Sequence, residues 1–148
     1  MQARISTISD KEITTGDSAV SGLLNGLIAG AAMALVIALF SLLSRQGLAY
    51  LTYFSAETPV PPLQGVLMHF GVSCTYGMIY GLLRHWTHLE RLKLPRMLTG
   101  LVYGLGLWAL AVTLILPAAN SLMLNLPWVV LFSAHAVYGL VLGMKQKP

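Results

Sequence analysis

Four long apolar segments, each with glycines at four-residue spacing, constrain the fold of this chain most. They are the runs at about 20–43, 63–83, 97–116 and 126–144. Each is close to the ~20 residues that an α-helix needs to cross ~30 Å of hydrocarbon. In a bilayer, small residues at this spacing let helix backbones approach closely. We therefore predict helix packing through Gly22, Gly26, Gly30, Gly77, Gly81, Gly100, Gly104, Gly139 and Gly143.

The composition excludes an ordinary water-soluble domain. Of the 148 residues, 56% are hydrophobic and only 9% are charged, which is far from the balance of a soluble domain. Residues 1–19 form a polar segment of mixed charge rather than a cleavable signal peptide, so we expect the first apolar helix to direct insertion. The sequence predicts an all-α integral membrane protein, a four-transmembrane-helix bundle that forms a single membrane domain over 1–148.

The positions of lysine and arginine predict the orientation in the membrane. The second connection holds Arg84, Arg91, Lys93 and Arg96, and the tail holds Lys145 and Lys147, whereas the connection 117–125 has no charge. Basic connections favour the cytoplasmic side, so both termini are expected to be cytoplasmic. The net charge of +4 then reflects topology and contact with anionic lipid headgroups, and we expect no nucleic-acid binding.

Matching sequence signatures suggest an internal repeat. The motif SGLLNGL, which begins at Ser21, matches TGLVYGL, which begins at Thr99. A second signature, YGMIYGLL from Tyr76, matches YGLVLGMK from Tyr138. These matches predict two tandem repeated helix hairpins inserted the same way round. The alternative is coincidence within a sequence rich in glycine and leucine.

Polar side chains inside the apolar segments predict two internal layers. Polar groups at membrane depth need partners, so the faces that carry them should point inward. His69 and His135 are expected in the outer half, about 9 Å and about 13 Å from the outer helix ends. On the third segment, Thr99, Tyr103 and Thr113 share a face. The predicted internal polar cluster consists of Asn25, Ser73, Tyr76, Tyr80, Tyr103 and Tyr138.

Two interpretations of the histidine pair remain open. Two imidazoles on different helices can ligate the iron of a b-type haem, which would make His69 and His135 a cofactor site. In the other interpretation, each imidazole forms a hydrogen bond across a helix contact and no cofactor is bound, which the sequence favours. No group of cysteine, histidine and carboxylate side chains has the spacing of a metal site.

The sequence contains no motif for catalysis. It has no nucleophile–base pair, no paired carboxylates and no phosphate loop, so we expect a protein that is not itself an enzyme, although it could belong to a redox enzyme complex. Tyr76, Tyr80, Tyr103 and Tyr138 could line a solute path, but mutual packing with glycine is the favoured interpretation.

In length and topology the chain resembles small multi-pass proteins of bacterial inner membranes. We expect an accessory or scaffold subunit that assembles with other membrane subunits or with itself. The alternatives are a haem-binding electron-transfer subunit and a small-solute channel or transporter.

Overall fold

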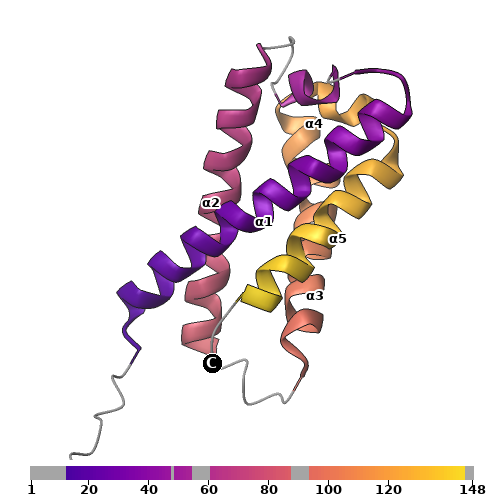
Figure 1. Ribbon diagram of the computed structural model, residues 1–148. Helices are drawn as coiled ribbons and strands as arrows, with labels where there is room; N and C mark the ends of the chain where they lie inside the picture. The colour runs from indigo at the N-terminus through magenta and orange to yellow at the C-terminus, as the bar shows by residue number, and fades with distance from the viewer. Residues whose placement is uncertain (1–12, 48, 55–60, 88–93, 146–148) are drawn as a thin grey trace, which may run out of the picture.

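The computed structural model describes residues 13–47, 49–54, 61–87 and 94–145, and these residues form helices and no strands. The long helices are α1 (Thr15–Leu43), α2 (Pro62–Thr87), α3 (Arg96–Leu110) and α5 (Trp128–Lys145). A π-helical turn, η3 (Ala111–Ile115), and the short α4 (Leu116–Ala118) continue α3, and two 3-10 turns, η1 (Ala49–Tyr53) and η4 (Leu122–Asn125), lie in connections. Figure 1 shows both of these turns at one end of the bundle.

Within the residues that the structure describes, three helical stretches are long and apolar enough to cross a membrane: Thr15–Leu43, Leu63–Thr87 and Arg96–Ala118. The last apolar stretch, Trp128–Met144, is shorter. The described chain is therefore an all-helical protein whose helices suit a membrane, and a fourth crossing by α5 stays a prediction.

Helix α1 begins earlier than the sequence predicted. We expected residues 1–19 to be polar and the first apolar segment to start at about 20, but the helix starts at Thr15. A capping box explains the difference, because the Thr14 hydroxyl accepts from the Asp17 amide while the Asp17 carboxylate accepts from the Thr14 amide. These two bonds satisfy amides that the first turn would otherwise leave unpaired.

The glycines lie where two pairs of antiparallel helices cross. A Cβ added at Gly22 or Gly26 would meet the backbone of α2 around Gly77, and one added at Gly77 would meet α1. The second pair repeats this arrangement, with Gly100 and Gly104 of α3 against Gly139 and Gly143 of α5. A Cβ added at Gly30 would meet the side chain of Ser73. The predicted packing glycines thus all lie at contacts within the chain.

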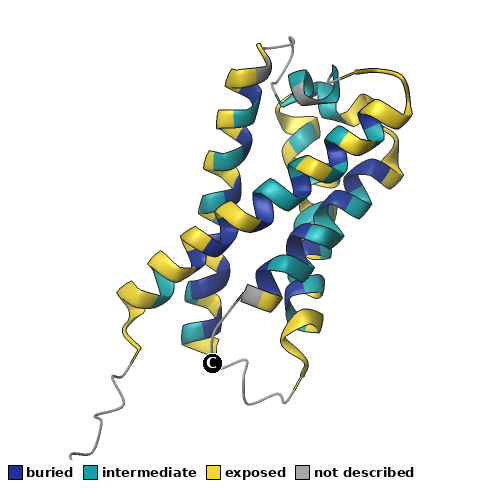
Figure 2. Cartoon of the chain, in the orientation of Figure 1, coloured by how far each residue is buried: buried dark blue, intermediate teal, exposed yellow. Residues whose placement is uncertain are grey.

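The two helix pairs join through α1 and α5. Along α1, Ala29, Met33 and Ile37 are buried at four-residue spacing. Along α5, the buried residues at the same spacing are Val130, Ala134, Tyr138 and Leu142. Such rows are the ridges that helices interdigitate. Figure 2 shows these buried faces meeting inside the bundle while yellow, exposed positions face outward on all helices.

The third helix contains a π-helical turn near its end, which the sequence did not predict. The expected segment 97–116 is observed as helical from Arg96 to Ala118, but Leu116 donates its amide hydrogen to Ala111, five residues back. Pro117 follows directly, and a proline cannot donate an amide hydrogen while its ring crowds the carbonyl four residues earlier. A local π-helical turn relieves that crowding. The regular spacing of 100° per residue had placed the Thr113 side chain inward, but within this turn it is exposed.

Candidate functional site

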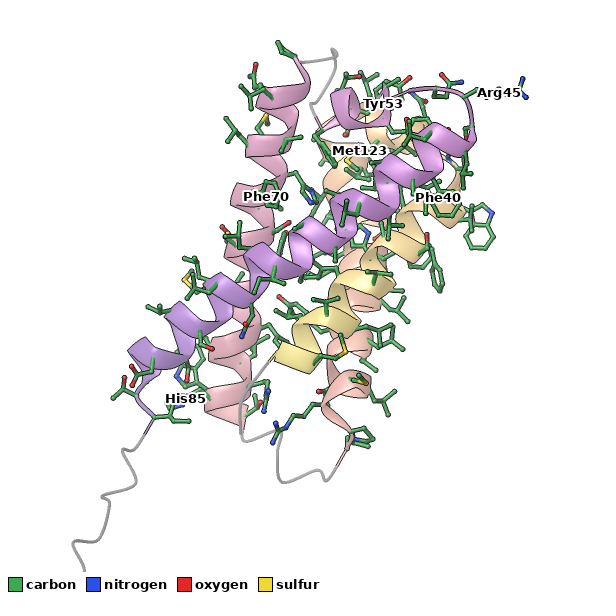
Figure 3. The ribbon with its side chains drawn as sticks, in the orientation of Figure 1. Phe40, Arg45, Tyr53, Phe70, His85 and Met123 are labelled. Atoms are coloured by element: carbon green, nitrogen blue, oxygen red, sulfur yellow. The ribbon has the colours of Figure 1, made fainter. Side chains whose placement is uncertain are left out.

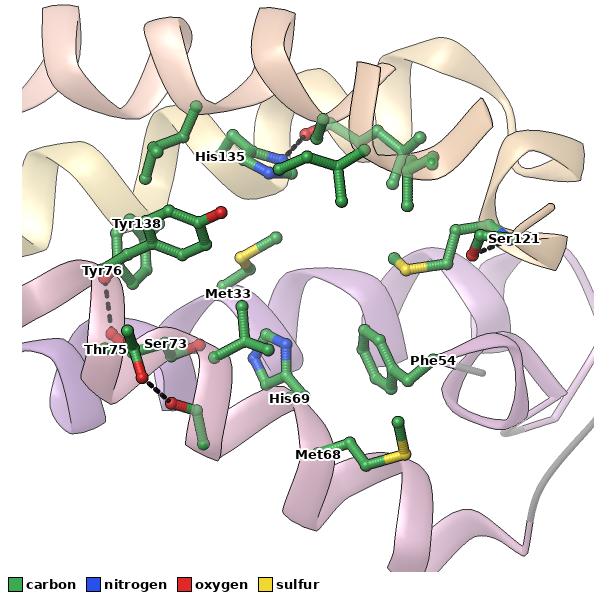
Figure 4. A pocket seen from close by; sticks show the side chains of 18 of the residues that line it. Met33, Phe54, Met68, His69, Ser73, Thr75, Tyr76, Ser121, His135 and Tyr138 are labelled. Carbon is green, nitrogen blue, oxygen red and sulfur yellow. Dashed lines mark hydrogen bonds between the residues drawn. The ribbon is translucent and has the colours of Figure 1, made fainter. Parts of the chain in front are cut away.

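A cavity of about 720 Å³ lies between the two helix pairs. Helix α1 packs on α2 and on α5, and α3 packs on α5, whereas α2 and the region from α3 to α4 stand on opposite sides of the cavity. Its lining includes Met33 from α1, Phe54 after η1, His69 and Tyr76 from α2, Leu107 from α3, Ile115 from η3, and His135 and Tyr138 from α5. The residues that line the cavity therefore come from both helix pairs, α1–α2 and α3–α5 (Figure 4).

The cavity has an exposed apolar rim and a buried polar interior. Met68, Val72 and Ile115 line it and are 47%, 55% and 39% exposed, so it reaches the outer surface between α2 and η3. His69 and Ser73 also line it, yet they are only 7% and 4% exposed. If the helices cross a bilayer, this opening faces lipid, because the rim lies well inside the apolar helices.

The His69 ring is held in place by contacts with two residues outside α2, Gly30 and Phe54. Its Nε2 lies 2.9 Å from the carbonyl oxygen of Gly30, and since a carbonyl only accepts, Nε2 carries the hydrogen. The ring stacks on Phe54 with centroids 4.7 Å apart. This contact fixes the ring plane, so His69 is a positioned side chain rather than a mobile one.

His135 bonds within its own helix. Its Nδ1 lies 2.8 Å from the carbonyl oxygen of Leu131, so Nδ1 donates and the other ring nitrogen, Nε2, has no hydrogen in the neutral ring. Figure 4 shows His135 and His69 on opposite walls of the cavity. The structure thus brings the two histidines of the predicted outer layer to one cavity.

Tyrosines form hydrogen bonds between helices at and beside this cavity. Tyr138 donates its hydroxyl hydrogen to the Ser73 carbonyl at 2.8 Å, and Tyr103 donates to the Tyr76 carbonyl at 2.8 Å. The Tyr80 and Tyr103 rings are 4.9 Å apart. Because these hydroxyls bond across helices, the predicted tyrosine cluster joins the two helix pairs. Tyr76 and Tyr138 also line the cavity, so both the packing interpretation and the solute path stay predictions.

A family model matches residues 16–147, which is nearly the whole chain. The protein belongs to the DUF6789 family. This family is described as one of unknown function, so membership in DUF6789 assigns no activity. No curated protein and no solved structure matches the chain.

Other polar residues of this DUF6789 member lie apart from the cavity. Asn25, predicted within the tyrosine layer, is buried and donates to the Ser21 hydroxyl of its own helix at 3.3 Å. His85 lies at the opposite end of the bundle from Tyr53 and Met123 (Figure 3), where its Nε2 is 3.1 Å from the Thr15 hydroxyl. Among the residues that the structure describes, no three histidine, cysteine or carboxylate side chains gather as a metal site.

Sequence reasoning missed several cavity residues. Met33 and Phe54 were not predicted as site residues, because apolar side chains in an apolar chain carry no signal that distinguishes a cavity from packing. Ile115 and Leu116 reach the cavity through the π-helical turn. The proline at 117 was the available signal, since such turns often occur next to prolines and at functional sites.

Proposed function

We propose that this protein is a non-catalytic membrane protein that binds an apolar small molecule in the cavity between its two hairpins. The observation that carries the proposal is the combination of an exposed apolar rim with a polar interior that contains the buried His69 and Ser73 and the half-buried His135. Ligand sites in proteins are typically 300–1,000 Å³, mostly apolar, and contain a few positioned polar groups. The cavity of about 720 Å³ fits that description.

The proposal includes a topology. Four helices cross the membrane as two tandem hairpins, and both termini lie on the cytoplasmic side of a bacterial inner membrane. The equivalent glycine crossings in the two helix pairs support the repeat. The basic residues between α2 and α3 support the orientation, because cytoplasmic connections are enriched in lysine and arginine.

Gly71→Trp tests the proposed binding site. Gly71 lines the cavity, is exposed, and has no atom within 4 Å of an added Cβ, so a large side chain fits there without displacing a helix. We expect a co-purifying apolar molecule, detected by native mass spectrometry after extraction in mild detergent, to be lost by at least about ten-fold. A ten-fold loss is only about 1.4 kcal/mol of binding free energy, which a filled cavity readily produces.

Gly106→Trp is the matched control. Gly106 also has open space around an added Cβ, but it lies on α3 outside the cavity lining. The control should keep the wild-type ligand content and the same thermal unfolding midpoint. Equal ligand content in Gly71→Trp and Gly106→Trp would reject the site, and so would wild-type protein that carries no bound molecule.

Haem b is the second candidate occupant. Histidines that ligate metals usually donate their other ring N–H to a carbonyl or carboxylate, and both His69 and His135 donate to backbone carbonyls while lining one cavity. We expect a reduced-minus-oxidised absorption spectrum to show a b-type band that disappears in His69→Ala and in His135→Ala if haem is bound. A featureless spectrum, or a band that survives both substitutions, removes this candidate.

The accessory-subunit interpretation stays a prediction. Its argument was that glycine faces exceed what the bundle itself needs, but the packing glycines lie at contacts within the chain. What supports partner contact is then the apolar outer surface alone, which lipid also covers.

A further inference from the structure

The two histidines of the cavity, together with Tyr138, present hydrogen-bond acceptors rather than donors. The hydrogen on His69 Nε2 goes to the Gly30 carbonyl, and the hydrogen on His135 Nδ1 goes to the Leu131 carbonyl. The Tyr138 hydroxyl hydrogen goes to the Ser73 carbonyl. Each of these side chains therefore has its donor occupied by backbone and keeps a lone pair for something else.

No described residue donates to the remaining lone pairs on the two histidines. Within the described chain, these rings form hydrogen bonds through His69 Nε2 and His135 Nδ1, and none through His69 Nδ1 or His135 Nε2. A neutral imidazole nitrogen without a hydrogen is an acceptor. Both histidines line the cavity, so these acceptors are available to a donor that enters it. A molecule in the cavity that donates a hydrogen bond would satisfy at least one of them.

The cavity also selects against charge. Its lining contains no aspartate, glutamate, lysine or arginine among the residues that the structure describes. An ammonium or carboxylate group would therefore be desolvated there without a counter-ion, which is costly. A neutral donor, such as a hydroxyl, has no such cost.

The rim and the interior set how such a molecule would lie. The exposed rim is apolar, with Met68, Val72 and Ile115, and the histidines lie on the walls behind it. An apolar body would occupy the rim and extend toward lipid, while a polar end would reach the histidines. One amphipathic molecule could therefore satisfy both parts of the cavity, with its apolar end at the rim and its polar end at the histidines.

We infer that the ligand is a neutral amphiphile with a hydroxyl group at its polar end, such as a phenol, a quinol or a long-chain alcohol, and that the hydroxyl donates to His69 Nδ1 or His135 Nε2. This inference rests on the proposed binding function of the cavity. It adds the chemical class of the ligand and the two atoms that recognise it.

A matched pair of probes tests the inference. In protein reconstituted in lipid nanodiscs, 4-octylphenol donates a hydrogen bond, whereas its methyl ether 4-octylanisole has the same apolar body and cannot donate. Site binding of each probe, measured by isothermal titration calorimetry, is the binding that Gly71→Trp removes and Gly106→Trp retains. We expect the phenol to bind about five- to ten-fold more tightly, as one added hydrogen bond predicts.

Histidine variants identify the acceptor. His135→Phe and His69→Phe keep an aromatic ring and remove the acceptor nitrogen. The preference for the phenol should fall in the variant that removes the recognising atom and vanish in the double variant. If the double variant does not fold, the wild-type preference and the single variants still decide the matter.

The outcomes separate this inference from the proposed function. Equal binding of the two probes, or tighter binding of the ether, overturns the donor inference and leaves a binding cavity. Binding of neither probe at the site overturns both. A haem band that depends on the histidines also overturns the inference, because iron would then use the same lone pairs.

Discussion

Gly26→Leu is expected to separate α1 from α2 and to lower the stability of the protein by about 3 kcal/mol or more. A Cβ at this position would lie 2.5 Å from the Ser73 carbonyl oxygen and 2.8 Å from the Gly77 Cα, so the helices must move apart. Overpacking a tight contact commonly costs 1–3 kcal/mol, and backbone atoms yield less than side chains. Unfolding titrations with sodium dodecyl sulfate in mixed micelles measure the change.

Gly106→Leu is the control for this effect. It makes the same change to helix propensity and apolar volume, but an added Cβ there meets nothing within 4 Å. The control should unfold at the wild-type detergent fraction. A Gly26→Leu protein as stable as Gly106→Leu would show that close approach through glycine does not hold the first hairpin together.

The glycine spacing predicted these crossings because the reason for it is local. A residue without a side chain at every fourth position leaves a groove along one face of a helix. Gly22 and Gly26 form such a groove on α1, and Gly77 and Gly81 form one on α2. The same reasoning at 100° per residue and 1.5 Å per residue predicted that His69 and His135 would lie at similar depth.

Two differences show where such reasoning ends. The polar segment before residue 20 was judged by its charge, but Thr14 and Asp17 use their polar groups to cap the helix, so it starts earlier. Thr113 was placed inward by extrapolating from Tyr103 along a regular helix, and the π-helical turn at Ala111–Ile115 changes that rotation. Its hydroxyl donates to the Ala109 carbonyl of its own helix, so it needs no partner across the bundle.

The cavity itself was beyond sequence reasoning. Its volume depends on how far α2 stands from the η3 region, and that distance depends on packing between residues far apart in the sequence. The sequence could identify His69 and His135 as polar residues that need partners. It could not show that their donors are already occupied by Gly30 and Leu131, which leaves acceptors in the cavity.

Ala134→Phe should separate α1 from α5 while α1 stays packed on α2 and α3 stays packed on α5. Ala134 is fully buried in the row of α5 residues that includes Val130 and Leu142, and this row meets the α1 row around Met33. A phenyl ring has no space there, so α1 and α5 must separate, at a cost of about 3 kcal/mol. We expect cysteine pairs across α1–α2 and α3–α5 to cross-link as in the wild type, and a pair across α1–α5 to lose cross-linking.

This variant should also lose the ligand, because the cavity takes His69 from one hairpin and His135 from the other. Ala109→Phe, on an exposed position of α3, introduces the same ring facing outward and should retain both the α1–α5 cross-link and the ligand. Retained binding in an Ala134→Phe protein with separated hairpins would mean that one hairpin binds the ligand alone. If the variant instead loses the ligand and the α1–α5 cross-link but keeps the α1–α2 and α3–α5 cross-links, the site exists only where the two helix pairs meet.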